Sequence, residues 1–163
     1  LDIGTGSGCI AIALRKNKNA EILAIDVSKS ALLLAKENAK INEVEINFLL
    51  QDILKTTALP KVDVIVSNPP YVLDKEKELM LDNVLDNEPH LALFVPNNNP
   101  LLFYKKIAEL AFTSLSKNGL LFFEINERFG KQTVDILNAI GFVDIELKKD
   151  INEKDRMIKA TKN

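Results

Sequence analysis

The chain has 163 residues, of which 47% are hydrophobic and 27% charged, a composition typical of one globular domain. Its formal net charge is -2 and its basic residues are scattered, which argues against a partner held mainly through phosphates. One cysteine excludes an internal disulfide, no Cys/His set is spaced for a metal, and no apolar run or leader indicates a membrane. We expect no metal, no membrane and a reducing, cytoplasmic setting.

The start of the chain falls inside a motif. Leu1 is not a methionine, and Asp2 already belongs to a glycine-rich stretch. We therefore expect the natural N-terminus to lie upstream and the first strand to be truncated.

The first part of the chain alternates between patterns typical of strands and of helices. In chain order we expect a helix over "CIAIALRK", a strand from Glu21 to Asp26, a helix N-capped by Ser28 that carries Ala31, Leu34, Ala35, Asn38 and Ala39 at helical spacing, and strands from Val44 to Leu50 and from Lys61 to Ser67.

The second part opens with an irregular stretch that reaches Pro100. We then expect a helix from Leu101 to Ser116, closed by Asn118-Gly119, with one face formed by Tyr104, Ile107, Ala108, Ala111 and Leu115. A strand from Leu120 to Asn126 should follow, and then a helix marked by Val134, Leu137 and Ile140 that Gly141 stops. The last two segments, "FVDIELKKD" and "DRMIKATK", should form an antiparallel pair. Strands that alternate with helices indicate an α/β domain over 1–163, with a mostly parallel sheet covered on both faces.

The stretch "LDIGTGSG" places Gly4, Gly6 and Gly8 between a strand end and a helix start. Glycine lets backbone approach a ligand closely, and a helix N-terminus offers free N–H groups to an anion. A plain strand-to-helix turn seldom needs three glycines. Asp26 ends the next strand, where a carboxylate can accept hydrogen bonds from ribose hydroxyls, so the sequence predicts a nucleotide-like ligand.

The glycine spacing favours one class of cofactor. A dinucleotide fingerprint needs a glycine where this chain has Cys9, whereas D-x-G-x-G-x-G suits a small carboxylate with an ammonium that Asp2 attracts. Asp52 is placed to accept from an adenine amino group, and Ile53 to form an apolar wall. A single strand-end Asp is commonly just solvated, but two at ligand-facing strand ends are less expected by chance. The whole set of residues favours S-adenosylmethionine over NAD. The expected cofactor-binding residues are Gly4, Thr5, Gly6, Ser7, Gly8, Asp26, Asp52, Ile53 and Asn68.

The strand that ends in "VSNPPY" stops at two prolines, which cannot donate to a sheet. The Asn68 side-chain oxygen and a carbonyl that precedes a proline are acceptors for the two hydrogens of an –NH₂ group. Pro69 and Pro70 hold these acceptors rigid, and Tyr71 can pack on a planar group. A turn that only ends a strand is the alternative interpretation. We predict that Asn68, Pro69, Pro70 and Tyr71 are catalytic.

The chemistry needs no further group. A sulfonium methyl is already activated, so neither a covalent nucleophile nor a catalytic histidine is required. We interpret His90 as a packing or surface residue, and Cys9 as a small buried one.

These motifs, together with "AIDVS", "QDIL", "EPHLAL", "GLLFFEIN" and "DRMIKA", resemble those of the release-factor glutamine methyltransferases, the HemK/PrmC family. The resemblance implies a Rossmann-like, seven-stranded S-adenosylmethionine-dependent methyltransferase fold with the last strand reversed. It implies methylation of the amide nitrogen of the Gln in the Gly-Gly-Gln tripeptide of peptide chain release factors. It places the methionine part on Gly4 to Gly8, the ribose on Asp26, the adenine on Asp52 and Ile53, and the glutamine amide on Asn68 to Tyr71.

The same resemblance implies a small helical domain upstream that helps hold the release factor. We expect a monomer whose main substrate is not nucleic acid. Two alternatives stay open at this point. "NPPY" also fits N6-adenine methyltransferases of DNA or RNA, and a module that binds the cofactor without turnover would carry the same glycine loop.

Overall fold

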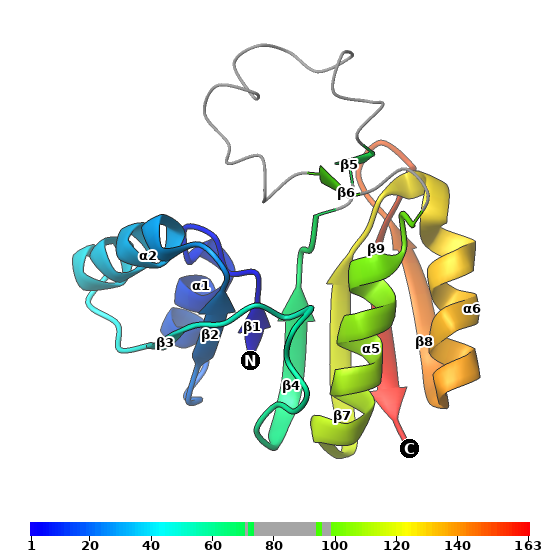
Figure 1. The fold of residues 1–163 in the computed structure, drawn as a ribbon, viewed down its shortest axis with the longest axis horizontal. Helices are drawn as coiled ribbons and strands as arrows, with labels where there is room; N and C mark the ends of the chain where they lie inside the picture. Colours follow the sequence, from blue (N-terminus) through cyan, green and yellow to red (C-terminus); the bar gives the residue numbers. More distant parts are fainter. Residues whose placement is uncertain (71, 74–93, 96–98) are drawn as a thin grey trace.

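The computed structural model describes residues 1–70, 72–73, 94–95 and 99–163. Strands and helices alternate along the chain (Figure 1). In order they are β1 (Asp2–Ile3), α1 (Cys9–Asn17), β2 (Leu23–Asp26), α2 (Lys29–Ile41), β3 (Asn47–Leu50), β4 (Val62–Ser67), β5 (Val72–Leu73), β6 (Phe94–Val95), α5 (Leu102–Ser114), β7 (Leu115–Glu124), the 3₁₀ turn η2 (Glu127–Phe129), α6 (Gly130–Ile140), β8 (Phe142–Lys149) and β9 (Asp155–Lys162).

One sheet of seven strands organises the molecule, in the order β3-β2-β1-β4-β7-β9-β8. The first five strands of that order pair in parallel. β9 is antiparallel to both of its neighbours, β7 and β8, so in this sheet it alone runs against the rest. The predicted seven-stranded α/β fold with a reversed last strand is therefore confirmed.

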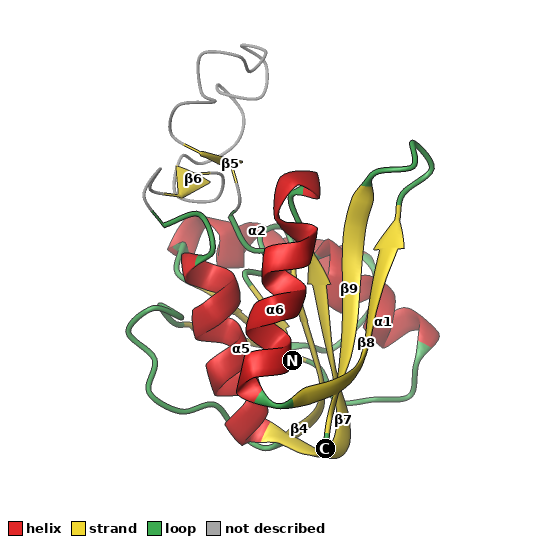
Figure 2. Ribbon diagram, turned by 90° about the vertical axis from the view of Figure 1, so that its right-hand side faces the viewer, coloured by secondary structure: helices red, strands yellow, loops and turns green. Residues whose placement is uncertain are grey.

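Helices cover both faces of the sheet. Figure 2 shows α5 and α6 on one side of the strands and α1 on the other. Adjacent residues of β2 separate accordingly, because side chains alternate along a strand. Ile25 packs in the large hydrophobic cluster with Tyr104 and Leu137, from α5 and α6, whereas Ala24 packs in a smaller cluster with Ala11 of α1. Each face thus has its own apolar core.

The helix ends obey local rules. The Ser28 hydroxyl accepts from the Ala31 backbone N–H at 3.2 Å, so the predicted N-cap of α2 is confirmed. Gly141 ends α6 in the left-handed region at φ 110°, as predicted. No helix within the described ranges is both long enough and apolar enough to cross a lipid bilayer.

The apolar face of α2 is rotated from the predicted one. Leu32 and Ala35 are buried together with Ala39, but Leu34 is 49% exposed. The strand predicted from Val44 begins only at Asn47, because the Val44 N–H is bonded to the Ala39 carbonyl in a turn that follows the helix.

The boundary between α5 and β7 also differs from expectation. α5 ends at Ser114 and β7 begins at Leu115, so Asn118-Gly119 does not close the helix. Leu115 pairs with Val62 and Leu120 with Val64, which leaves a bulge in β7 that contains Asn118 at φ 62°. The hydroxyls of Ser114 and Ser116 donate to carbonyls before and within β4 and so hold the chain against that strand.

The stretch predicted to be irregular up to Pro100 lies largely outside the described residues. Its two ends form a short parallel pair, with Val72 opposite Phe94 and Leu73 opposite Val95. The chain that follows the double proline is therefore paired with the chain that leads to α5. Tyr71, His90 and "EPHLAL" lie outside the described residues.

Candidate functional site

The predicted site residues gather where the carboxyl ends of three neighbouring strands meet. β1 lies between β2 and β4, with Ile3 opposite Ile25 on one side and Ser67 on the other. From β1 the chain continues through α1 to β2, and it later crosses back to β4 on the opposite side. Open α/β sheets bind ligands in a crevice outside the strand ends at such a reversal, so we expect the crevice of this chain here.

The three glycines of the loop that follows β1 all adopt positive φ: 73° at Gly4, 55° at Gly6 and 84° at Gly8. Side chains rarely tolerate this region, so the backbone itself requires glycine. A Cβ atom at Gly8 would lie 3.1 Å from the Cβ of Ala35, whereas one at Gly6 would meet nothing within 4 Å. Gly8 is thus a packing contact with α2, and Gly6 leaves an open side for a ligand.

Asp26 ties the end of β2 to this loop. Its Oδ2 accepts from the Gly6 backbone N–H at 2.9 Å, and its Oδ1 accepts from that of Ser28 at 2.8 Å. Each carboxylate oxygen has two acceptor positions, so both keep capacity for a further donor. Asp26, the residue predicted to bind the ribose, therefore also orders the loop.

Asp2 and Thr5 form a buried pair beneath the loop. Asp2 is 1% exposed, and its Oδ2 accepts from the Thr5 hydroxyl at 2.7 Å. Its Oδ1 has no hydrogen-bond partner within the part of the chain that the structure describes. Burial raises the pKa of Asp2, and the Thr5 hydrogen bond only partly opposes that rise. The Thr5 side chain faces this carboxylate, and its backbone N–H donates to the Ile25 carbonyl at 3.1 Å, so both donors of Thr5 are bonded within the protein.

Asp52 and Ile53 follow β3 at the same edge of the sheet. Asp52 accepts from the Leu54 backbone N–H at 3.0 Å and pairs with the exposed Lys55 ammonium at 3.2 Å. Desolvation alone would raise the pKa of Asp52, but the hydrogen bonds from Lys55 and Leu54 outweigh it and lower the pKa. Ile53 is only 9% exposed and packs in the large core cluster. Most of its surface therefore contacts protein.

The Asn-Pro-Pro motif begins directly beside the glycine loop. The buried hydroxyl of Ser67 donates to the Ile3 carbonyl at 2.7 Å, which joins the ends of β4 and β1. One residue further along, the Asn68 backbone oxygen lies 4.0 Å from the point that a Cβ atom at Gly4 would occupy. Asn68 is exposed, Pro69 is buried and Pro70 is half-buried. The structure thus brings Asn68 and the glycine loop together.

Two residues near the loop differ from expectation or were not predicted. Cys9 is exposed, so its interpretation as a buried residue is wrong; its Sγ lies 3.2 Å from the Ser7 hydroxyl. Asn38, which the sequence placed only by helical spacing, donates from Nδ2 to the Ser7 carbonyl at 2.9 Å. The signal in the sequence for such a contact is an amide side chain among the small apolar residues of one helix face.

Two further features of the described residues bear on whether a second site exists. Within the described ranges, no group of three or more His, Cys, Asp or Glu side chains is arranged to hold a metal ion. A recess of about 840 Å³ lies near the amino ends of β2 and β3, lined by Glu21, Ile22, Ile46 and Phe48 among others. We place the site at the carboxyl edge of the sheet instead, because the residues predicted to bind the cofactor lie together there.

Comparison with known proteins gives both a family and curated relatives. The methyltransferase small domain family matches residues 1–94. The chain is 58% identical over 162 residues to the release factor glutamine methyltransferase of Flavobacterium psychrophilum, and this match covers 98% of the chain and 57% of that protein. It is 45% identical over 165 residues to the protein of the same name from Bacteroides thetaiotaomicron, with coverages of 99% and 59%. The chain thus spans a little over half the length of these relatives.

Solved structures share the fold at lower identity. A methyltransferase from Pyrococcus furiosus superposes with a TM-score of 0.73 at 18% identity, covering 100% of this chain and 75% of that one. The ribosomal protein L11 methylase of Lactobacillus delbrueckii subsp. bulgaricus gives 0.68 at 23% identity, with coverages of 99% and 69%. The strand order, the glycine loop after β1 and the family match agree, and the chain therefore belongs to the methyltransferase small domain family.

Proposed function

We propose that this chain binds S-adenosylmethionine at the carboxyl edge of its sheet. We further propose that the protein that carries it methylates the side-chain amide nitrogen of the Gln in the Gly-Gly-Gln tripeptide of a peptide chain release factor. The observation that carries the proposal is the 4.0 Å approach of the Asn68 carbonyl oxygen to the Cβ position of Gly4. It brings the backbone of Asn68 beside the loop expected to hold the methyl donor. The names of the curated relatives support the choice of substrate.

The cofactor would lie across the crevice from the glycine loop to the end of β3. Its carboxylate would approach the Ser7 backbone N–H, which no hydrogen bond between described residues occupies. Its ammonium would face the buried carboxylate of Asp2, whose Oδ1 lacks a partner among those residues. The ribose hydroxyls would donate to Asp26, and the adenine would lie near Asp52 and Ile53.

The residues of this chain would make a weak nucleophile competent. An amide nitrogen attacks poorly because its lone pair is delocalised into the carbonyl. The Asn68 side-chain oxygen and a carbonyl that precedes a proline would accept both of its hydrogens, which stabilises the positive charge that develops as the N–C bond forms. Pro69 and Pro70 fix these acceptors, and Tyr71 would pack on the amide plane. Alignment with the activated methyl supplies the remaining acceleration.

Residues 1–163 would thus form one methyltransferase domain, and a release-factor substrate would place the reaction in the cytoplasm. The experiment offers labelled S-adenosylmethionine to the protein that carries this chain, with a release factor, the same factor with Gln replaced by Ala in its Gly-Gly-Gln tripeptide, and adenine-containing DNA and RNA in parallel. We expect label on the unaltered release factor only. Label on nucleic acid would identify an N6-adenine methyltransferase, and binding without transfer to any substrate would identify a cofactor-binding module.

A further inference from the structure

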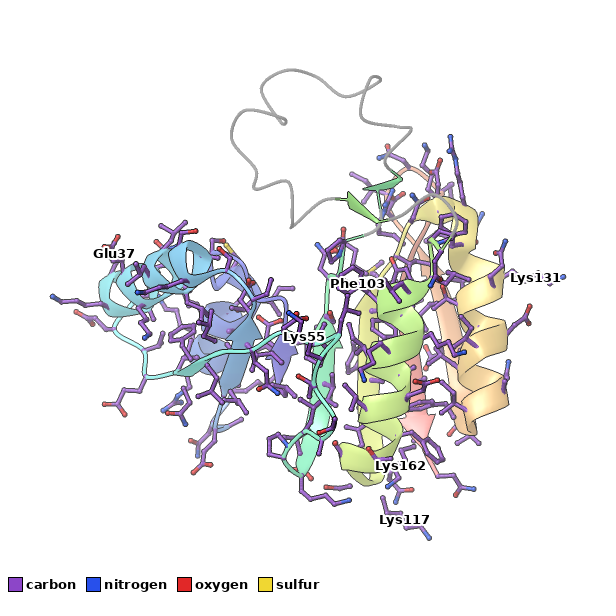
Figure 3. The ribbon with its side chains drawn as sticks, in the orientation of Figure 1. Glu37, Lys55, Phe103, Lys117, Lys131 and Lys162 are labelled. Atoms are coloured by element: carbon purple, nitrogen blue, oxygen red, sulfur yellow. The ribbon has the colours of Figure 1, made fainter. Side chains whose placement is uncertain are left out.

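Helix α2 reaches the glycine loop through the side chain of Asn38. Its Nδ2 donates to the backbone carbonyl of Ser7 at 2.9 Å, across 31 residues of sequence. Figure 3 shows the preceding residue, Glu37, on the outer side of α2, pointing away from the sheet. Successive residues of a helix are about 100° apart, so Asn38 lies on another side of α2, the side that its hydrogen bond joins to the loop. The contact therefore joins two elements that the sequence does not connect locally.

The Ser7 carbonyl belongs to a peptide unit that is hydrogen-bonded at both of its ends. Its oxygen accepts from Asn38, and its N–H, from Gly8, donates to the Thr5 carbonyl at 2.9 Å. Glycine flanks Ser7 on each side, and glycine imposes almost no steric resistance to rotation of a peptide. Without the Asn38 amide, only the Gly8 N–H bond to Thr5 would hold this peptide unit, and the Ser7 carbonyl would lose its partner. A carbonyl that turned into the crevice would repel an anion.

The support beneath Asn38 is itself well anchored. Ala35, one turn earlier on the same face, is fully buried and would lie 3.1 Å from a Cβ at Gly8. Asn42, one turn later, donates to the Asn38 carbonyl at 2.9 Å and accepts from Lys16 of α1 at 3.3 Å. The loop thus rests on α2 through van der Waals contact at Ala35 and through a directional hydrogen bond at Asn38.

We propose that Asn38 is a positioning residue for the cofactor: by holding the Ser7 carbonyl away from the crevice it keeps the Ser7 N–H facing the carboxylate of S-adenosylmethionine. The proposal rests on the proposed cofactor site and adds a residue that touches no ligand. It makes Asn38 a determinant of affinity for the carboxylate-bearing end of the cofactor. The adenosine end does not depend on it.

The test compares Asn38→Ala, Asn38→Asp and the matched control Asn17→Ala in the protein that carries this chain. The exposed Asn17 of α1 donates to the Ala13 carbonyl at 2.8 Å, so Asn17→Ala removes the same kind of amide-to-carbonyl hydrogen bond without touching the loop or Asn38. We expect Asn38→Ala to weaken S-adenosylmethionine binding about tenfold, the equivalent of about 1.4 kcal/mol, by calorimetry. Asn38→Asp should bind S-adenosylmethionine at least as weakly as Asn38→Ala does, because its carboxylate places a second acceptor against the Ser7 carbonyl. Asn17→Ala should bind like the wild type.

Two further readouts separate positioning from general weakening. Decarboxylated S-adenosylmethionine, which lacks only the carboxylate, should bind the wild type and Asn38→Ala equally. Amide hydrogen exchange of residues 6–9 in the ligand-free protein should be faster in Asn38→Ala than in Asn17→Ala. Equal affinity of Asn38→Ala and the wild type for S-adenosylmethionine overturns the proposal, as does an equal loss for the decarboxylated analogue. A wild type that fails to bind the cofactor refutes the proposed function instead, and the exchange measurement still decides whether Asn38 orders the loop.

Discussion

Asp26 and Gly6 lie 20 residues apart in the sequence, and the Gly6 backbone N–H donates to Oδ2 of Asp26 at 2.9 Å. The residue expected to hold the ribose therefore also shapes the loop expected to hold the methionine part. A substitution at Asp26 removes two kinds of interaction at once. Replacement by Asn keeps a neutral acceptor, whereas replacement by Ala keeps none.

We predict that Asp26→Ala weakens S-adenosylmethionine binding by about 1.5–3 kcal/mol, roughly ten- to a hundredfold, because charge-assisted hydrogen bonds are lost. Asp26→Asn should lose less. Calorimetry measures both, with Asp63→Ala as the control, since the exposed Asp63 accepts from Ser116 at 2.8 Å far from the crevice. Unchanged affinity in Asp26→Ala would remove Asp26 from the site.

Asn68→Ala should separate catalysis from cofactor binding. The Asn68 acceptor matters most as positive charge develops on the attacking nitrogen, so we expect a rate loss of about 10²–10³-fold with little change in cofactor affinity. Single-turnover methyl transfer to a release factor at saturating cofactor measures the rate. The exposed Asn138 on α6 provides the control variant, Asn138→Ala, which should react at the wild-type rate. Full turnover by Asn68→Ala would contradict the catalytic role.

Gly6→Ala and Gly8→Ala should fail for different reasons. Both positions have positive φ, which costs an alanine about 1–2 kcal/mol. At Gly8 the added methyl also crowds Ala35 and Ile12, at 3.1 and 3.3 Å, which costs about 1–3 kcal/mol more. At Gly6 the methyl meets no protein atom within 4 Å and projects into open space. Urea denaturation should show the larger loss of stability for Gly8→Ala.

Cofactor titration completes that comparison. Gly6→Ala should lose affinity out of proportion to its small loss of stability, because its methyl occupies space that the ligand needs. If Gly6→Ala binds the cofactor as tightly as the wild type, the ligand does not approach the loop at Gly6.

Asp2→Asn should stabilise the protein at neutral pH while weakening cofactor binding. Burial raises the folded-state pKa of Asp2 above the ordinary value of 3.8, so between these two values the folded state binds more protons than the unfolded state. The free energy of unfolding therefore falls as pH rises through this interval. An Asn at this position does not ionise, so it avoids that loss of stability, and its side-chain oxygen can still accept from the Thr5 hydroxyl.

The measurement is urea denaturation of both proteins from below pH 3.8 to neutrality. The advantage of Asp2→Asn should be smallest at the acid end and should grow as the pH approaches the raised folded-state pKa. Loss of the carboxylate also removes the partner proposed for the cofactor ammonium, so affinity at neutral pH should drop. A stability difference that does not vary with pH would show that Asp2 is ionised equally in both states.

Local sequence determined the elements and their chemistry. Ser28 caps α2, Gly141 ends α6, and Gly4, Gly6 and Gly8 occupy backbone positions that other residues resist. Each of these features depends on a few neighbouring residues, through a cap, a period or a single dihedral angle, so the sequence alone could predict it. The alternation of strands and helices determined the parallel sheet in the same way, and the motif set determined the family.

Tertiary structure decided how those elements meet. Leu34 faces outward and Leu32 inward because α2 rests on the sheet and on Gly8. Ile53 turns into the core, and Cys9 stays exposed beside Ser7. The contacts between Asn38 and Ser7 and between Asp26 and Gly6 join residues 31 and 20 positions apart. Such contacts depend on which strands become neighbours and in which register, and nothing within one turn or one strand of sequence encodes that order.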